Sequence, residues 1–286
     1  MEMTAECVPC LLRRVLFETE LVAPERTREV MAGALEVMDR GFVEGVNSAS
    51  LATEVHRRAY HLIGDRDPYR RLKEEADRVA ESLYPRAREF VESSPDGLRA
   101  AVQCAIAGNV MDFGIGKGFD RPEDLVEAFD SIVNQRLGID HLPRVRKILE
   151  EADKVLFLFD NCGEAVFDKL LISEIQAMGV RVKGVAKGQP ILTDVTREDA
   201  ERVSLATLVD GLLETGGFAV GIPQDPGPLG GEMENADLIL AKGMANFEAL
   251  SDSPYRPIAY IMRAKCRPVA EAIGARQDDN VVRLYE

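Results

Sequence analysis

The spacing of apolar residues changes near residue 150, and this change limits the fold more than any other feature of the chain. Before it, apolar side chains recur every three or four residues, as in Leu72, Ala76, Val79, Ala80 and Leu83, which is the spacing of amphipathic helices. After it, short β-rich runs alternate with helical patterns. Such alternation is typical of βαβ units on a mostly parallel sheet. The sequence therefore predicts an α/β fold, with a Rossmann-like, mostly parallel sheet and flanking helices, plus an α-helical N-terminal region.

We place the boundary between the two parts at residue 145. A mainly helical region then spans 1–145, and an α/β domain that we expect to bind metal and carry catalysis spans 146–286. In the second part, helical patterns lead to Met178, run from Thr196 to about Leu208, and begin again at Asn246 and Pro268. The expected strands between them are the runs 155–159, 180–186, 217–222, 236–241, 257–262 and 280–285.

The composition argues against several kinds of partner. A chain of 286 residues forms one or two globular domains. Its 49 acids and 35 bases give a net charge of −14, so neither nucleic acid nor an anionic membrane surface is expected as a partner. No apolar run approaches the ~20 residues of a membrane span, and the N-terminal sequence lacks the pattern of a signal peptide. The expected compartment is the cytoplasm.

Polar side chains follow several of the expected strands at the point where each strand ends. Asp160 and Asn161 close the first strand, Asp194 follows the second, and Lys242 and Asn246 follow a later one. In an open α/β sheet, ligands bind beyond the carboxyl ends of the strands, so these side chains are expected to face one cleft. Two aspartates and an amide oxygen suit Mg²⁺ or Mn²⁺.

Other roles compete with this interpretation. Either aspartate taken alone could equally be a helix N-cap, where aspartate is favoured, but their joint position at strand ends beside Asn161 favours a metal. His56, His61 and His141 all lie in the helical part. None has the spacing of a zinc protease motif or of a Ser/His/Asp partner, so the sequence gives little support to imidazole-driven acyl chemistry.

Five separated motifs resemble one family. They are CVPC at 7–10, AGNVMDFG at 107–114, FDNCGEAVFDKLL at 159–171, PILTDVTREDA at 190–200 and AKGMANFE at 241–248. Together they resemble the metal-dependent damage-control phosphatases, long called domain of unknown function 89. The N-terminal CxxC is similar to that of the prokaryotic and archaeal branch.

The resemblance implies a helical N-terminal region packed on an α/β domain, and hydrolysis of small phosphate monoesters such as sugar phosphates or damaged phosphometabolites. It implies a divalent metal ion, Mg, Mn, Co or Ni, and a small phosphorylated metabolite as partner, and it leaves a homo-oligomer open. Asp160, Asn161 and Asp194 would bind the metal, with Asp160, Asp194 and Glu164 as the catalytic residues. The residues expected near the substrate phosphate or the attacking water are Asn109, Asp112, Glu164, Lys242 and Asn246.

Two of these residues also have structural interpretations. Glu164 is an acid in the first turn of an expected helix, where the helix dipole favours it, and Cys162 departs from the small residue usual in the family motif. Lys242 would add a fixed positive charge to the phosphoryl oxygens; its alternative is an exposed surface lysine.

The cysteines allow more than one interpretation. Cys7 and Cys10 form half of a zinc or redox site that Cys266 could join, and a pair of reduced thiols on a helix is the alternative. Cys104 lies in an Ala-rich helix and is expected in the core. The run GIGKG at 114–118 is not the phosphate-binding GxxxxGK[ST] motif, and we expect a turn.

Three classes of function stay open from the sequence. The first is the metal-dependent phosphatase. The second is an S-adenosylmethionine-dependent methyltransferase, which would carry a glycine-rich loop where this chain has DNCGE at 160–164. The third is a non-catalytic module that binds a metal or a sugar phosphate.

Overall fold

The computed structural model describes residues 1–108 and 124–286, and its centre is a sheet of seven strands. Asn109, Asp112 and the run 114–118 lie outside the described residues. The strand order is β1-β7-β6-β5-β2-β3-β4, and every neighbouring pair is parallel except β6 and β7. The strands are β1 (Leu137–Asp140), β2 (Lys154–Leu158), β3 (Arg181–Ala186), β4 (Gly211–Glu214), β5 (Leu238–Lys242), β6 (Ile258–Arg263) and β7 (Asn280–Tyr285). The predicted fold class, a mostly parallel sheet with flanking helices, is confirmed.

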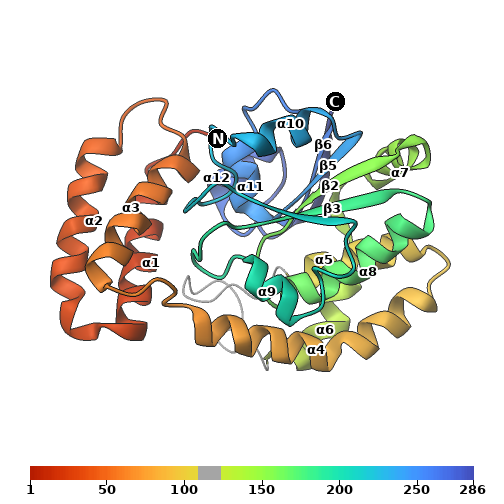
Figure 1. The fold of residues 1–286 in the computed structure, drawn as a ribbon, viewed down its shortest axis with the longest axis horizontal. Coiled ribbons are helices and arrows are strands. Elements are labelled where there is room, and N and C mark those ends of the chain that lie inside the picture. The colour runs from red at the N-terminus through yellow and green to blue at the C-terminus, as the bar shows by residue number, and fades with distance from the viewer. Residues whose placement is uncertain (109–123) are drawn as a thin grey trace.

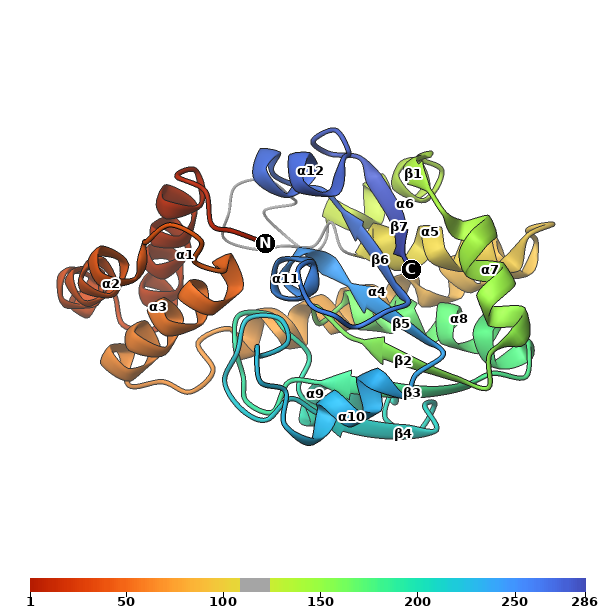
Figure 2. The same cartoon turned by 90° about the horizontal axis from the view of Figure 1, so that it is seen from above.

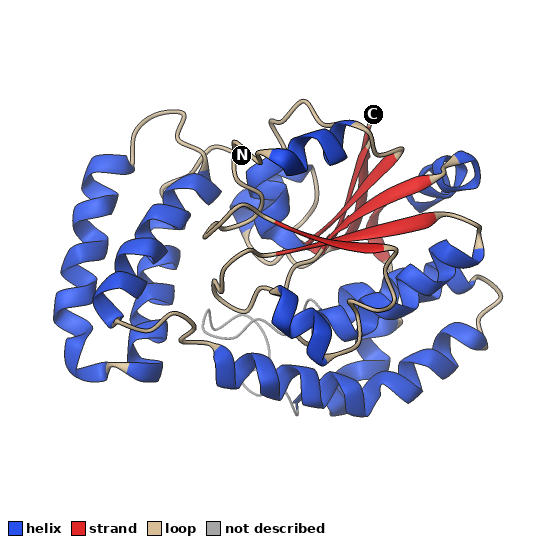
Figure 3. Ribbon diagram, in the orientation of Figure 1, coloured by secondary structure: helices blue, strands red, loops and turns tan. Residues whose placement is uncertain are grey.

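Helices cover both faces of the sheet (Figure 3). The first face carries α4 (Arg70–Glu92), α5 (Gly97–Gly108), α6 (Asp124–Val133), α7 (Leu142–Glu151), α8 (Glu164–Ala177) and α9 (Arg197–Arg202). The second face carries α10 (Pro228–Glu234), α11 (Gly243–Leu250) and α12 (Arg267–Ile273). Successive side chains of a strand point to opposite faces. Val155 and Phe157 of β2 therefore pack into the first core, and Leu156 and Leu158 pack into the second.

The first helices form a lobe beside the sheet (Figure 1). This helical lobe comprises α1 (Cys7–Val22), the short helix η1 (Pro24–Arg26), α2 (Thr27–Gly41) and α3 (Ser48–Ile63). It has an apolar core of its own, which includes Val15, Val30 and Val55. Helices α4 to α6 instead share the core of the sheet, and β1 pairs with β7. The division into 1–145 and 146–286 stays a prediction, and residues on both sides of position 145 build the sheet.

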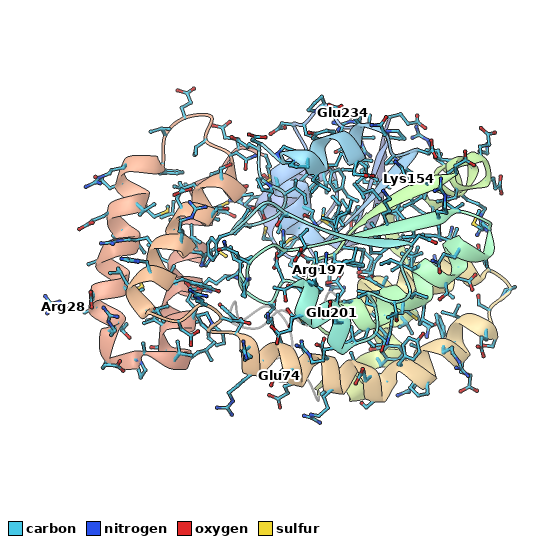
Figure 4. All side chains as sticks on the ribbon, viewed as in Figure 1. Arg28, Glu74, Lys154, Arg197, Glu201 and Glu234 are labelled. Carbon is cyan, nitrogen blue, oxygen red and sulfur yellow. The ribbon has the colours of Figure 1, made fainter. Side chains whose placement is uncertain are left out.

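Surface and interior alternate closely along these helices. Glu74 of α4 points away from the protein in Figure 4, whereas the preceding residue, Lys73, is 1% exposed and lies in the interior. Within the described residues, no helix combines the length and the apolar character that crossing a membrane requires.

Some predicted elements were wrong. The run 217–222 is not a strand; the fourth strand is β4, at Gly211–Glu214. The apolar side chains of that run are explained by packing beside the helical lobe, because Val220 packs with Ala49 and its N–H donates to Thr53 Oγ1 at 2.9 Å. The helix predicted from Thr196 to Leu208 ends at Arg202. Soon after it, Ser204 adopts φ 60°, which a helix cannot accommodate.

Candidate active site between the helical lobe and the strand ends

A cavity of about 520 Å³ separates the helical lobe from the carboxyl ends of the central strands. Asp160, Asn161, Asp194 and Lys265 line it from the sheet side. The helical lobe lines the cavity with one face of α1 and one face of α3. From α1 come Cys7, Cys10, Leu11 and Arg14, and from α3 come Ser48, Ala52 and His56. Figure 2 shows α1 and α3 facing α11 and the neighbouring strands. The volume falls within the range of about 300–1,000 Å³ that small-molecule sites occupy.

Asp160 lies at the topological switch point of the sheet. The chain leaves β2 toward β3 on one side, while β5 pairs with β2 on the other, and open α/β sheets bind ligands at such a crevice. Gly243 at the start of α11 has φ +74°, and a Cβ atom there would lie 1.8 Å from Asp160 Oδ2. Only glycine in this conformation lets the carboxylate approach the beginning of α11 so closely.

Asn161 and Asp194 are held together by the backbone and by hydrogen bonds. The two residues form an isolated antiparallel bridge, and Val195 N donates to Asp160 O at 2.8 Å. The hydroxyl of Thr193 donates to Asn161 Oδ1 at 2.6 Å, and Asn161 Nδ2 donates to Asp160 Oδ2 at 2.6 Å. The structure thus brings the three predicted metal ligands into one cavity wall, where the three residues are between 3% and 7% exposed.

The two aspartates, which we call the pocket pair, are not helix caps. The N-cap of α8 is Gly163, and α9 is capped by Thr196 in a capping box with Asp199. Burial raises the pKa of Asp160 well above its ordinary value, and the charges of Glu164 and Asp194 raise it further. Burial also raises the pKa of Asp194, although Lys187, with Nζ 3.4 Å from Asp194 Oδ2, opposes that rise. Ionised, the pair is a concentration of negative charge beside the cavity.

Comparison with known proteins identifies the architecture. The model of the damage-control phosphatase ARMT1-like domain matches residues 3–281. The chain belongs to this family. A damage-control phosphatase from Archaeoglobus fulgidus is 37% identical over 290 residues, covering 100% of both chains. A damage-control phosphatase from Pyrococcus horikoshii is 28% identical over 278 residues, covering 96% of this chain and 94% of the relative.

A solved structure supports the same assignment. The crystal structure of a DUF89 family protein from Pyrococcus horikoshii has a TM-score of 0.88 and 27% identity, and the match covers 100% of both chains. The predicted family is confirmed. Membership of this family supports a phosphatase role. The assignment to a branch by its N-terminal CxxC stays a prediction.

In this member of the damage-control phosphatase family, Lys242 points into the interior. Its Nζ donates to Glu164 Oε1, to Asp168 Oδ1 at 2.6 Å and to Ala105 O at 3.2 Å, and all three side chains of this buried triad, Lys242, Glu164 and Asp168, are 0% exposed. Burial works against the charged lysine, but Asp168 and then Glu164 raise its pKa above the ordinary value. Lys242 is therefore neither an exposed surface lysine nor a lining residue of the cavity, and its contact with a phosphate stays a prediction.

Glu164 and Asn246 lie next to the cavity wall. Glu164 begins α8, and Asn161 Nδ2 donates to its Oε2 at 3.3 Å, so it links the buried triad to the predicted metal ligands. Asn246 Nδ2 donates to Lys242 O at 2.8 Å and to Phe159 O at 3.1 Å. Within the described residues its buried Oδ1 has no hydrogen-bond partner. Both side chains make hydrogen bonds at the strand ends, and their contact with the substrate or the attacking water stays a prediction.

The sequence interpretation missed several cavity residues of this family member. Lys265 follows β6 and is only 4% exposed; its charge lowers the pKa of Asp160. Arg14 of α1 acts in the same sense on Asp194. The position of Lys265 directly after a buried strand was the available signal, the same one that selected Asp160. Arg14 carries no such signal, because only the docking of α1 brings it to the sheet.

The three cysteines singled out from the sequence all line the cavity. Cys7 and Cys10 come from α1, and Cys266 precedes α12. Burial raises the pKa of Cys266 to about 11, and the neighbouring Cys7 and Cys10 add to this. None of the three forms a disulfide, and their role stays a prediction. Cys104 is 0% exposed and lies in the core, as expected.

An ionic network, which we call the support network, holds the loops behind the site. It comprises Asp67, Lys73, Asp77, Asp199 and Arg202. Lys73 Nζ lies 2.9 Å from Asp67 Oδ2 and 2.8 Å from Asp199 Oδ2, and Arg202 Nη2 lies 2.6 Å from Asp77 Oδ2. Asp77 Oδ1 in turn accepts from Gly163 N at 2.6 Å, at the turn between β2 and α8. The support network therefore fixes the backbone that carries Asp160 and Asn161.

Proposed function

We propose that this chain hydrolyses small phosphate monoesters, such as sugar phosphates or damaged phosphometabolites, with a divalent metal ion bound by Asp160, Asn161 and Asp194. The observation that carries the proposal is the joint placement of these three side chains at the carboxyl ends of β2 and β3, in a cavity that also exposes Lys265 and Arg14. Family membership supports the phosphatase part of it. The metal and the substrate are the parts that experiment has to test.

The donor set fits a hard cation. Among the described residues no group of three His, Cys, Asp or Glu side chains is arranged to hold a metal. The candidate set instead combines two carboxylates with an amide, which suits an ion such as Mg²⁺ that keeps several waters. Asn161 Oδ1 now accepts from Thr193 and its Nδ2 faces Asp160. An amide oxygen has two lone pairs, so Asn161 Oδ1 can keep the Thr193 hydrogen bond while it binds a metal.

The acidic and the basic side chains around the cavity would have different roles. A bound metal would neutralise phosphoryl charge and lower the pKa of a bound water. Lys265 and Arg14, which line the same cavity as Asp160 and Asp194, would attract the phosphate of the substrate. Glu164 reaches Asn161 rather than the cavity, so it orients that amide through the Nδ2 hydrogen bond. The buried triad keeps Glu164 in place.

The test is phosphate release from a panel of sugar phosphates and one aryl phosphate by the purified protein. We expect turnover with added Mg²⁺, Mn²⁺, Co²⁺ or Ni²⁺, and loss of turnover after exhaustive chelation, with recovery when metal is returned. Full turnover after chelation would refute the metal's role. Metal and sugar phosphate binding with no turnover on the whole panel would favour the non-catalytic module. The methyltransferase alternative has no support from the family match.

A further inference from the structure

A histidine and a glutamate form a buried pair inside the helical lobe. His56 of α3 is 1% exposed and Glu18 of α1 is 0% exposed. His56 Nδ1 lies 3.0 Å from Glu18 Oε1. Burial raises the pKa of Tyr60 most, and the nearby negative charge of Glu18 is the second cause of the rise. The pair lies among the apolar side chains that hold α1 and α3 together, such as Val15 and Val55.

The two oxygens of Glu18 share one partner. Glu18 Oε2 has no hydrogen bond among the described residues, although it too lies 3.0 Å from His56 Nδ1. Because Nδ1 faces Glu18, Nε2 is the ring nitrogen left for a contact outside the pair, and His56 is one of the side chains that line the cavity. A buried polar pair is rarely more stabilising than an apolar pair of the same size. Its presence at the cavity wall therefore calls for a reason beyond packing.

The position of His56 relative to the strand ends restricts what it can contact. Tyr60 lies one helical turn further along α3, and its hydroxyl accepts from Leu192 N at 2.9 Å. Leu192 lines the cavity in the left-handed conformation, φ 48°, two residues before Asp194. The α3 wall and the loop of Asp194 are thus joined directly. His56 faces the cavity from the helical lobe, while the pocket pair faces it from the sheet.

The hydrogen bond to Glu18 determines whether the other ring nitrogen of His56, Nε2, donates or accepts a hydrogen bond. When neutral His56 donates from Nδ1 to the Glu18 carboxylate, Nε2 carries a lone pair and is an acceptor. A phosphate dianion has only acceptor oxygens, so it cannot donate to Nε2. A hydroxyl of the organic part of a phosphate ester can donate.

We propose that His56, positioned by Glu18, is a specificity residue that accepts a hydrogen bond from a hydroxyl group in the organic part of the substrate, which favours polyhydroxylated phosphate esters over aryl phosphates. This inference rests on the proposed function. It places the alcohol portion of the substrate against the helical lobe, where His56 lines the cavity. A site built to hydrogen-bond a substrate hydroxyl discriminates strongly against analogues that lack it, because its own polar group is then left unpaired.

The experiment compares a hexose phosphate with p-nitrophenyl phosphate, which has no hydroxyl group. For His56→Leu we expect kcat/KM to fall about 10- to 100-fold on the hexose phosphate and less than about 3-fold on the aryl phosphate. His56→Gln, whose amide oxygen can accept, should recover part of the loss. Glu18→Gln should lower the hexose selectivity without changing aryl turnover, because it releases the ring orientation. The matched control is His61→Gln, since His61 lies on the same helix but is exposed and outside the cavity lining.

A second variant guards against simple misfolding. Glu18→Met combined with His56→Leu removes the buried pair as a unit, so that no charge is left unpaired, and it should show the same selective loss. Equal losses on both substrates, or unchanged selectivity in the folded variants, would overturn the proposal and leave a structural pair.

Calorimetry separates this proposal from the proposed function. The wild type should bind the hexose phosphate more tightly than inorganic phosphate, and the His56 variants should lose that difference while keeping the affinity for inorganic phosphate. This result would support the role of His56 even if no ester were hydrolysed. An equal loss of affinity for inorganic phosphate would show that His56 contacts the phosphate instead, and wild-type binding of the hexose phosphate no tighter than inorganic phosphate would refute the inference outright.

Discussion

Two aspartates, Asp160 after β2 and Asp199 in the first turn of α9, are buried to a similar extent, but their pKa values are shifted in opposite directions. They are 6% and 4% exposed. Burial and the charges of Glu164 and Asp194 raise the pKa of Asp160 well above its ordinary value. Burial also acts on Asp199, but Lys73 and the hydroxyl and N–H of Thr196 outweigh it and lower the pKa of Asp199 to about 2.

The difference separates a residue that stabilises the fold from one that weakens it. A carboxylate whose pKa is lowered in the folded state adds stability at neutral pH, whereas one whose pKa is raised subtracts stability when ionised. Asp199 contacts both Lys73 and Arg202 in the support network. Asp160 lines the cavity close to Glu164 and Asp194, whose charges oppose its ionisation. An acid kept at a cost to stability beside a cavity is a candidate for binding a cation or a substrate.

The largest expected effect concerns the buried triad, where the acids, like Asp199, contact a buried cation. Lys242→Met leaves the carboxylates of Glu164 and Asp168 buried without their cation, so we expect the free energy of unfolding to fall by about 3–5 kcal/mol. Urea unfolding measures it. The control is Lys183→Met, because the Lys183–Glu232 ion pair is partly exposed and should cost less than about 1 kcal/mol. Similar losses for the two variants would mean that burial does not govern the strength of these pairs.

The next effect separates activity from stability. Asp160→Asn removes one charge from the pocket pair and keeps the side-chain shape, so we expect turnover at saturating metal to fall about 100- to 1,000-fold. The metal-free variant should be at least as stable as the wild type, because a buried, repelled charge has gone. Phosphate release and urea unfolding are the two measurements, with the exposed Asp39→Asn as control. An Asp160 variant that unfolds easily but turns over normally would reverse the comparison.

A smaller effect concerns pH and the support network. Because the pKa of Asp199 is lowered from 3.8 to about 2, its contribution to stability is fully present above about pH 4 and is lost as the pH falls toward 2. Asp199→Asn should therefore cost about 2 kcal/mol at pH 7, and its difference from the wild type should shrink as the pH is lowered through this window. Urea unfolding at a series of pH values measures both chains. A difference that stays constant with pH would exclude the charge as its source.

The smallest effect tests whether the cavity cations act on the substrate. Lys265→Met should raise KM for a phosphate monoester about 10-fold, equivalent to about 1.4 kcal/mol, because one charge that attracts the phosphate is removed. Inhibition by inorganic phosphate should weaken in parallel. Lys147→Met, on the exposed side of α7, is the control. An unchanged KM would place the phosphate away from Lys265 and sharpen the question of which cation meets it.

The sequence by itself determined the fold class, the family and the meeting of Asp160, Asn161 and Asp194 at one site, and their role as metal ligands stays a prediction. These follow from local patterns: an apolar strand that ends in Asp160 and Asn161, and a following strand whose loop carries Asp194. Parallel strands align their carboxyl ends, so residues at those ends meet whatever the rest of the chain does. Asn109 and Asp112, which the family motif also selected, lie outside the described residues, and their roles stay predictions.

Only the tertiary structure decided where the long side chains point and which distant segments share the cavity. Lys242 ends β5 and Lys265 follows β6, yet the first contacts Glu164, 78 residues away along the chain, and the second lines the cavity. His56 looked unremarkable in a helical sequence and became a cavity residue because α3 docks beside the loop of Asp194. The run 217–222 looked like a strand because its apolar residues pack beside the helical lobe. Periodicity records which face of an element is buried, but the partner on that face is set by contacts between segments far apart in the chain, and no local pattern encodes those contacts.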